Sequence, residues 1–289
     1  MFSKKSAVCS IASFLIFLGF SSPASSADHR TLQIKGSDTM VNLGQAWAEE
    51  FMRAHPDVSI AVTGGGSGTG IASILSGTCD IAQSSRELKE QELSKAKATG
   101  KPVTQTVVGL DGLALVVHPN NPVSQLTIDQ LSDIFTGKVT NWKALGGKNL
   151  PILVLSRERN SGTHVYFLEH VLRRGKADGR EEFSTSALMM PSSQAIAQEV
   201  ESSEAGIGYI GLGYVTPRQK VLGIAQAPQG PYVHPSLETA QSGEYPISRP
   251  LYFLTRGELE GDLKDFVDFA TSPQGQEIVQ MLDFVPVKK

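Results

Sequence analysis

The chain has 289 residues, and its 26 basic and 29 acidic side chains give a net charge of −3 at pH 7. A balance so close to neutral, without a basic run, argues against nucleic acid or a membrane surface as the partner. The hydrophobic content of 40% is ordinary for a globular protein. The histidines show no spacing with cysteines or carboxylates that would hold a metal, so we expect neither a metal site nor a cofactor.

Residues 1–27 have the organisation of a secretory signal peptide. A basic end is followed by an apolar stretch and by small residues that end at Ala27, where we expect cleavage. The apolar stretch is too short for a comfortable membrane span. Cys9 lies inside it rather than at its far end, so we expect no lipid anchor. The exported protein would keep Cys79 as its one cysteine, most simply a buried small hydrophobe that forms no internal disulfide.

Strands alternate with helices after the signal peptide, and each strand is followed by hydroxyl residues. This order predicts a largely parallel α/β arrangement in which a ligand lies at the carboxyl ends of the strands. For a single helix start, an N-cap is the simpler explanation of such hydroxyls, and a surface loop is an alternative for the third group. The strands are expected at residues 32–35, 58–62 and 79–83, followed by Gly36-Ser37-Asp38-Thr39, the glycine stretch 63–70 and Ser84-Ser85-Arg86.

The glycine stretch, residues 63–70, joins a strand to a helix that ends at Gly77. Without Cβ atoms, such a turn lets backbone N–H groups and the start of the helix converge on an anion. A purely structural turn is the alternative for this stretch alone. The sequence departs from the P-loop, from the dinucleotide-binding pattern and from the nucleophile elbow around Ser67. What remains is a cradle for a small anion.

The second half of the chain repeats the strand, hydroxyl and helix order once more. Turn residues 118–122 indicate a lobe boundary near residues 115–122. Residues 226–250 are rich in proline, glycine and polar side chains, which predicts irregular structure. We expect strands at residues 107–117, 152–155, 206–211 and 251–254, and helices at residues 127–135, 163–172, 194–200, 263–270 and 273–282.

Two arginines distinguish the segment that follows the strand at residues 152–155. Arg157 and Arg159 precede Ser161, Gly162 and Thr163, a third glycine and hydroxyl helix start. A guanidinium offers a charged, forked set of donors that suits phosphate or carboxylate. Since the two arginines lie two residues apart on an extended segment, we expect one of them, Arg157, to face the site, while a solvated surface charge is the alternative for either.

Taken together, the four segments resemble the phosphate-binding motifs of the periplasmic phosphate-binding proteins of ABC transporters. They occur in that family's order, and the resemblance covers essentially the whole mature chain. It implies a two-lobed periplasmic-binding-protein fold of the second type, with mixed or parallel sheets, helices on both faces and a hinge that is crossed twice. The expected division is a signal peptide at 1–27, lobe 1 at 28–115, lobe 2 at 116–246 and the return of lobe 1 at 247–289.

The resemblance also implies a set of ligand residues and partners. Where some members have an aspartate that accepts the proton of phosphate, this chain has Ser85 followed by Arg86, as other members do. The implied function is high-affinity binding of inorganic phosphate in the periplasm, by a monomer, for the membrane permease of an ABC importer. The implied phosphate ligands are Thr39, the Met40 N–H, Ser67, Ser85, Arg86, Arg157, Ser161, the Gly162 N–H and Thr163.

Two alternatives follow from the same residues. The binding fold could serve another oxyanion, such as sulfate or molybdate, or a sensor. An exported phosphate-ester hydrolase would use Ser67 or Ser161 as the nucleophile and would need a base within hydrogen-bond reach. His164 is near Ser161 in sequence, but three residues along a helix it would point away from the site. We therefore expect a binding protein and not an enzyme.

Overall fold

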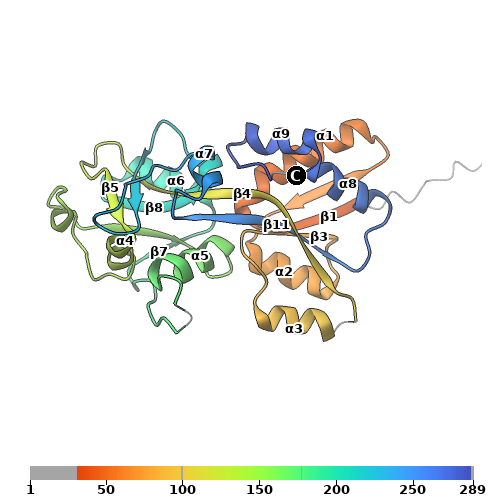
Figure 1. Ribbon diagram of the computed structural model, residues 1–289, viewed down its shortest axis with the longest axis horizontal. Coiled ribbons are helices and arrows are strands. Elements are labelled where there is room, and N and C mark those ends of the chain that lie inside the picture. The colour runs from red at the N-terminus through yellow and green to blue at the C-terminus, as the bar shows by residue number, and fades with distance from the viewer. Residues whose placement is uncertain (1–30, 99, 177, 288–289) are drawn as a thin grey trace, which may run out of the picture.

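Two strands run through both lobes of the protein and join them. The computed structural model describes residues 31–98, 100–176 and 178–287, so the expected signal peptide lies outside the described residues. Strand β4 (Val103–Val117) pairs with β11 (Ser248–Arg256) up to Gly112 and with β8 (Gly206–Gly211) from Leu113 onward. Figure 1 shows β4 and β11 passing side by side between the lobes. The expected two-lobed fold with two crossings is confirmed.

Lobe 1 is a mixed sheet covered on both faces. Its strands lie in the order β2-β1-β3-β11-β4, with the first three parallel and β11 antiparallel to both of its neighbours. Helices α1, α8 and α9 cover one face, and α2 and α3 lie on the other (Figure 1). The bounds are β1 Thr31–Gly36, β2 Ser59–Thr63, β3 Ile81–Ser84, α1 Val41–Ala54, α2 Ser67–Ser76, α3 Glu90–Ala98, α8 Gly261–Thr271 and α9 Pro273–Met281, with a 3-10 turn at Asp38–Met40.

Alternation along β11 explains why helices are needed on both faces of this sheet. Successive side chains of a strand point to opposite faces. Accordingly, Leu251 and Phe253 belong to the apolar cluster that holds Trp47 of α1, whereas Tyr252 and Leu254 belong to the cluster of α2. An apolar run of this kind has no face for solvent and is stable only between two layers.

Lobe 2 continues the sheet from the second half of β4. The order there is β4-β8-β6-β7, with β6 parallel to both of its neighbours, and β9 pairs with the other side of β4. The bounds are β6 Leu153–Arg157, β7 Leu188–Met190, β9 Lys220–Val221, the paired β5 Gln125–Thr127 and β10 Gly223–Ala225, and helices α4 Ile128–Phe135, α5 Gly162–Phe167, α6 Ser193–Ser202 and α7 Leu237–Ser242.

Two expectations about helices need correction. Residues 226–250 are not irregular throughout, because they contain α7 and the first residues of β11. A capping box between Ser236 and Thr239 begins α7, a local signal that outweighs the polar composition. The helix expected over residues 163–172 is α-helical only to Phe167 and continues as a π-helical turn, Leu168–Leu172. Among the described residues, no helix is both long and apolar enough to cross a membrane.

We predict that Gly36→Ala destabilises the protein by about 3 kcal/mol, against about 1 kcal/mol for Gly257→Ala. Both glycines have a positive φ, +144° and +76°. A Cβ at Gly36 would lie 2.2 Å from the backbone oxygen of Gln83, whereas nothing lies within 4 Å of one at Gly257. Denaturant unfolding of the two variants measures the difference, and equal losses would contradict the steric argument.

Candidate anion-binding site

The hydroxyls of lobe 1 meet because three parallel strands end at the same edge of the sheet. Ser37 follows β1, Ser67 begins α2 after the three glycines that follow β2, and Ser85 follows β3. The Ser37 hydroxyl donates to Ser85 Oγ at 2.9 Å, and Ser67 Oγ lies 3.3 Å from the same oxygen. The Ser85 N–H donates to Ser67 Oγ at 3.1 Å. The predicted convergence at the carboxyl ends of the strands is therefore present.

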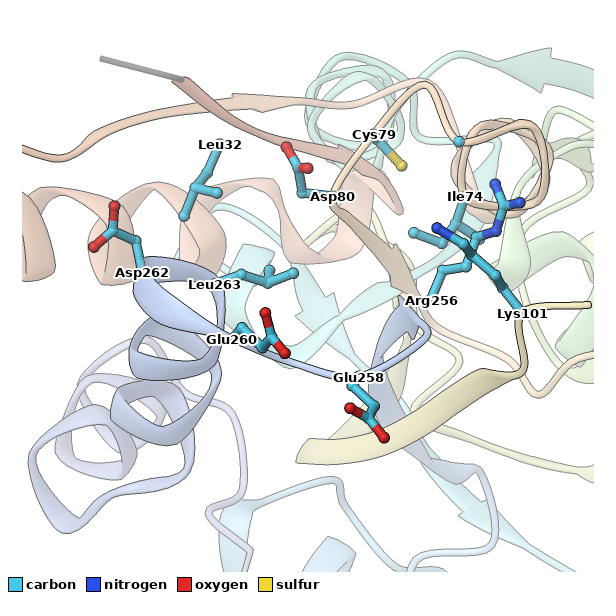
Figure 2. Close-up of a pocket in the computed structure, with 11 residues that line it drawn as sticks. Leu32, Ile74, Cys79, Asp80, Lys101, Arg256, Glu258, Glu260, Asp262 and Leu263 are labelled. Carbon is cyan, nitrogen blue, oxygen red and sulfur yellow. The ribbon is translucent and has the colours of Figure 1, made fainter. Parts of the chain in front are cut away.

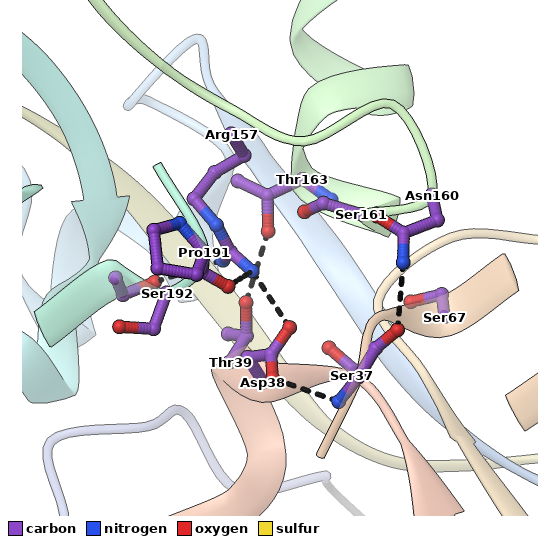
Figure 3. Close-up of polar contacts among 12 residues, drawn as sticks. Ser37, Asp38, Thr39, Ser67, Arg157, Asn160, Ser161, Thr163, Pro191 and Ser192 are labelled. Carbon is purple, nitrogen blue, oxygen red and sulfur yellow. Dashed lines mark hydrogen bonds and ion pairs between the residues drawn. The ribbon is translucent and has the colours of Figure 1, made fainter. Parts of the chain in front are cut away.

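Lobe 2 contributes its hydroxyls from the start of α5. Thr163 Oγ1 lies 2.9 Å from Thr39 Oγ1, so a hydrogen bond joins the two lobes directly (Figure 3). Gly162 packs against the lobe 1 serines so closely that a Cβ there would be 2.3 Å from Ser67 Oγ and 2.7 Å from Ser85 Oγ. Only glycine fits at this contact.

Water is excluded from this group of hydroxyls. We call the six side chains the hydroxyl cluster: each is 2% exposed or less, and they are Ser37, Thr39, Ser67, Ser85, Ser161 and Thr163. Buried polar groups are costly unless they are hydrogen-bonded. A cluster that consists of donors and lies between two lobes is suited to a small anion that accepts several hydrogen bonds at once.

Some hydrogen-bonding groups of Ser161, before α5, and of Met40, before α1, are already used within the chain. Ser161 Oγ accepts from the N–H groups of Thr163 and His164, which leaves the hydroxyl proton of Ser161 for another acceptor. The Met40 N–H donates to the Ser37 carbonyl oxygen at 3.0 Å, and the Met40 side chain is buried in the core of lobe 1. The structure thus places Ser161 in the cluster and Met40 next to Thr39 of the cluster, and in each of them one polar group is already hydrogen-bonded within the chain.

The glycine stretch lines the hydroxyl cluster and also forms hydrogen bonds with Asn160 of lobe 2. The Gly68 N–H donates to the Asn160 carbonyl oxygen at 2.8 Å, and Asn160 Nδ2 donates to the Gly65 carbonyl oxygen at 2.8 Å. Gly66, at φ +87°, would place a Cβ 2.8 Å from the same Asn160 oxygen. The missing Cβ atoms therefore permit close contact between the lobes, a use of these glycines beyond the expected anion cradle.

Arg157 is buried and Arg159 is exposed, as expected, but the spacing of two residues is not the reason, because residues two apart on a strand face the same side. Arg159 is exposed because β6 ends at Arg157 and Arg159 lies in the loop that follows. Nη2 of Arg157 forms an ion pair of 2.7 Å with Asp38 of lobe 1 (Figure 3). The remaining bonds of the guanidinium go to lobe 2, namely to Met190 O at 3.3 Å, Pro191 O at 2.9 Å and Ser193 Oγ at 3.4 Å.

Asp38 fixes the geometry around this ion pair. Its second carboxylate oxygen accepts from the Gly65 N–H at 2.9 Å, and its carbonyl oxygen accepts from the Tyr214 hydroxyl at 2.7 Å. Asp38 belongs to a recognised motif, but its pairing with Arg157 was not expected from the sequence. The residue next to Thr39 thus connects the glycine stretch to the arginine of the other lobe.

Arg86 directs its charge away from the hydroxyl cluster. Nη1 and Nη2 donate to the two carboxylate oxygens of Glu92, both at 2.8 Å, and Nη1 also donates to the Glu87 carbonyl oxygen. A bidentate pair of this kind satisfies a guanidinium well. In this structure Arg86 therefore bonds within lobe 1 and not to the hydroxyl cluster, although the resemblance implied it as a phosphate ligand.

Sequence reasoning missed a second buried arginine, Arg249 of β11. Its Nη2 contacts Thr163 Oγ1 at 2.9 Å, Thr39 Oγ1 at 3.4 Å and Asp111 Oδ2 at 3.0 Å. Desolvation raises the pKa of the Asp111 carboxyl, and the charge of Arg249 opposes the rise. A signal was present, because Asp111 interrupts the apolar run at residues 107–117 and a charge inside a buried strand requires a partner.

Neither candidate nucleophile has a base beside it in the described part of the chain. The hydrogen bonds of Ser67 Oγ and Ser161 Oγ are with Ser85 and with backbone N–H groups. The His164 ring lies behind the site, stacked on Phe183, with Nδ1 3.3 Å from Ser156 Oγ. Burial lowers the pKa of His164 to about 4. This position agrees with the expectation that His164 points away from Ser161.

A separate pocket lies at the opposite end of the lobe 1 strands (Figure 2). Its lining combines Lys101 and Arg256 with the acidic side chains of Asp80, Glu258, Glu260 and Asp262. The acidic side chains make it a poor site for an anion. Cys79 also lines this pocket, and burial raises the pKa of its thiol to about 12, so it is the inert, buried cysteine that was expected.

Comparisons with known proteins agree with the geometry. A family model described as the PBP superfamily domain matches residues 21–274. The phosphate-binding protein PstS of Bacillus subtilis is 34% identical over 258 residues, which cover 89% of this chain and 81% of that protein. PstS of Pseudomonas aeruginosa is 32% identical over 270 residues, which cover 87% of this chain and 81% of that protein.

Solved structures show the same fold. A phosphate-bound protein from Clostridium perfringens, described as a substrate-binding protein of a phosphate ABC transporter, superposes with a TM-score of 0.80 at 35% identity, over 90% of this chain and all of that one. A phosphate transport receptor of the ABC type from Vibrio cholerae gives a TM-score of 0.71 at 28% identity, over 89% of this chain and all of that one. The chain therefore belongs to the PBP superfamily and, within it, to the family of the phosphate-binding proteins PstS.

Proposed function

We propose that this protein binds inorganic phosphate between its two lobes outside the cytoplasm and delivers it to the membrane permease of an ABC importer. The observation that carries the proposal is the hydroxyl cluster, which is buried and is built by both lobes. The names of the family members and the phosphate bound in the C. perfringens relative support the same ligand. Phosphate would accept from Thr39, Ser67, Ser161 and Thr163, with the Met40 and Gly162 backbone and Ser85 beside it.

The number of donors is sufficient for tight binding. A hydrogen bond to a charged group contributes about 1.5–3 kcal/mol, and micromolar affinity requires about 8 kcal/mol. Four or five such bonds therefore reach this range even after part is lost to ordering and desolvation. Since the donors come from both lobes, binding and closure of the lobes would occur together.

Fixed charge contributes less to this site than its two arginines suggest. Arg157 is paired with Asp38 and Arg249 with Asp111, so each buried cation is matched by a buried or half-buried carboxylate. A site of this kind recognises the shape and protonation of the anion through neutral donors and acceptors. That property fits a protein that must select one oxyanion among several of the same charge.

The remaining features of the proposal follow from the sequence. Export through the segment 1–27 would place the protein in the periplasm, and the division at 28–115, 116–246 and 247–289 would give two lobes that move about β4 and β11. We propose that the protein acts as a monomer and without catalysis. The hydrogen bonds of Ser67 and Ser161 support the absence of catalysis, since no base of the described chain is among their partners.

Titration calorimetry against phosphate, sulfate and molybdate tests the function directly. We expect micromolar or tighter binding of phosphate, and a preference over sulfate of at least about tenfold, or about 1.4 kcal/mol. Near pH 8 both ligands are mainly dianions, so charge alone cannot produce the preference. Tighter binding of sulfate or molybdate would assign the protein to another oxyanion, and turnover of a phosphate ester would revive the hydrolase.

Ser85 is expected to accept the proton that distinguishes hydrogen phosphate from sulfate. Its oxygen already accepts from the Ser37 hydroxyl, which leaves a further lone pair for the ligand. We predict that Ser85→Ala weakens phosphate selectively and lowers the phosphate-to-sulfate affinity ratio, whereas Ser85→Asp weakens sulfate further. Competition titrations of the three proteins measure the ratio. An unchanged ratio in Ser85→Ala would place the acceptor elsewhere.

Arg157→Ala is expected to weaken phosphate binding by about 3 kcal/mol or more, because it leaves Asp38 unpaired beside Thr39 and removes an ion pair between the lobes. Arg159→Ala is the matched control, since Arg159 is exposed on the same segment. We expect it to change the affinity by less than about 0.5 kcal/mol. Calorimetric titration of both variants decides the matter, and equal losses would show that the wrong arginine was assigned.

A further inference from the structure

Arg249 occupies a position in the site that neither the motifs nor the helix starts account for. It lies near the start of β11, where the chain crosses between the lobes, and it is 2% exposed. Its Cα partner across the sheet is Asp111 of β4, so the ion pair joins the two crossing strands. The same Nη2 atom also reaches Thr39 of lobe 1 and Thr163 of lobe 2.

These contacts determine where the threonine protons can point. A guanidinium donates and never accepts, so each threonine oxygen that Arg249 contacts must act as an acceptor toward it. The direct bond between Thr39 Oγ1 and Thr163 Oγ1 uses one of the two hydroxyl protons. The other proton is directed away from Arg249. A bound anion is the natural acceptor for it.

A purely structural role would not require these contacts. An ion pair between crossing strands would be complete with Asp111 alone, whereas Nη2 also bridges hydroxyls from both lobes. The guanidinium also faces the Tyr166 ring, with its carbon 5.4 Å from the ring centroid. Nε and Nη1 are buried without a hydrogen-bond partner. Arg157 differs, since all three of its nitrogens are bonded to the protein.

We propose that Arg249 is a positioning residue of the anion site: by donating to Thr39 and Thr163 it keeps their protons directed away from itself, so that both hydroxyls donate to the ligand once the anion replaces the direct bond between them, and it brings a positive charge next to them. This inference rests on the proposed phosphate binding. Because its two threonine contacts lie in different lobes, Arg249 also favours the arrangement in which both hydroxyls face one anion. Asp111 fixes the guanidinium for this role.

The first test compares phosphate affinities by calorimetry. Removing Arg249 alone would leave Asp111 buried and unpaired, so the variant of choice is the double substitution Arg249→Met with Asp111→Asn. Arg256→Met is the matched control, because Arg256 lies on the same strand but lines the remote pocket. We expect a loss of at least about thirtyfold for the double variant and less than about threefold for the control.

A conservative variant separates the effect of the positive charge and the forked donors of Arg249 on phosphate affinity from the effect of side-chain packing. Arg249→Lys keeps a cation beside Asp111 but loses the fork, so its affinity should lie between those of the wild type and the double variant. Circular dichroism checks that each variant folds. A folded double variant within about threefold of the wild type would overturn the inference, as would a lysine variant no better than the double variant.

A second measurement needs no variant. In crystals of the wild-type protein with phosphate, Arg249 should remain within hydrogen-bond distance, about 3 Å, of both threonine oxygens, and both hydroxyls should contact the ligand. An Arg249 side chain that has left the threonines would overturn the inference. If the wild-type protein fails to bind phosphate in calorimetry, the proposed function fails first, which distinguishes the two outcomes.

Discussion

The main constraint on this structure is that polar groups buried between the two lobes cost free energy unless they are hydrogen-bonded. Six hydroxyls and two guanidinium groups lie out of contact with water in the cluster and beside it. Each must therefore find a partner in the protein or in a ligand. The serines of lobe 1 bond to one another, Thr39 and Thr163 bond to each other across the two lobes, and the arginines bond to aspartates. The site is thus organised around hydrogen bonds, with charges that largely compensate.

This organisation explains why the fold brings the site residues from distant parts of the chain. Parallel strands present their carboxyl ends at one edge, and a helix that starts there carries its first-turn residues to the same edge. β1, β2 and β3 do this in lobe 1 and β6 does it in lobe 2. The glycines then allow the two edges to touch, as the contacts of Gly162 with Ser67 and of Gly66 with Asn160 show.

Much of this arrangement could be predicted from the sequence, because it is local. The strand, hydroxyl and helix order predicted the places of Ser37, Ser67 and Ser161. Arg157 is buried and Arg159 exposed, as expected, but the end of β6 at Arg157 accounts for this and the period of a strand does not, since residues two apart share a face. α7 was missed because the composition of its surroundings was given more weight than its capping box. The π-helical turn after α5 has no marker such as proline in its sequence.

The part that could not be predicted is the pairing of charges across the fold. Asp111 and Arg249 are 138 residues apart in the chain, and Asp38 and Arg157 are 119 apart. No periodicity connects such positions, since their contact depends on how β4 and β11 cross and how the lobes meet. A buried charge in an apolar strand shows that a partner exists without showing which one. The sequence can therefore indicate that Asp111 needs a partner, and only the fold identifies that partner as Arg249.

The position of the Asp111 and Arg249 pair links the site to the crossing strands. Both residues lie where β4 changes its partner from β11 to β8, next to the start of lobe 2. A rotation of one lobe about these strands would separate Thr39 from Thr163, while the pair itself would stay within the crossing. Arg249 could then keep at most one threonine contact in an open arrangement. In the proposed cycle of opening and closing, closure would complete the second contact, so the charge at the crossing would favour the closed state through the same hydroxyls that are proposed to bind the anion.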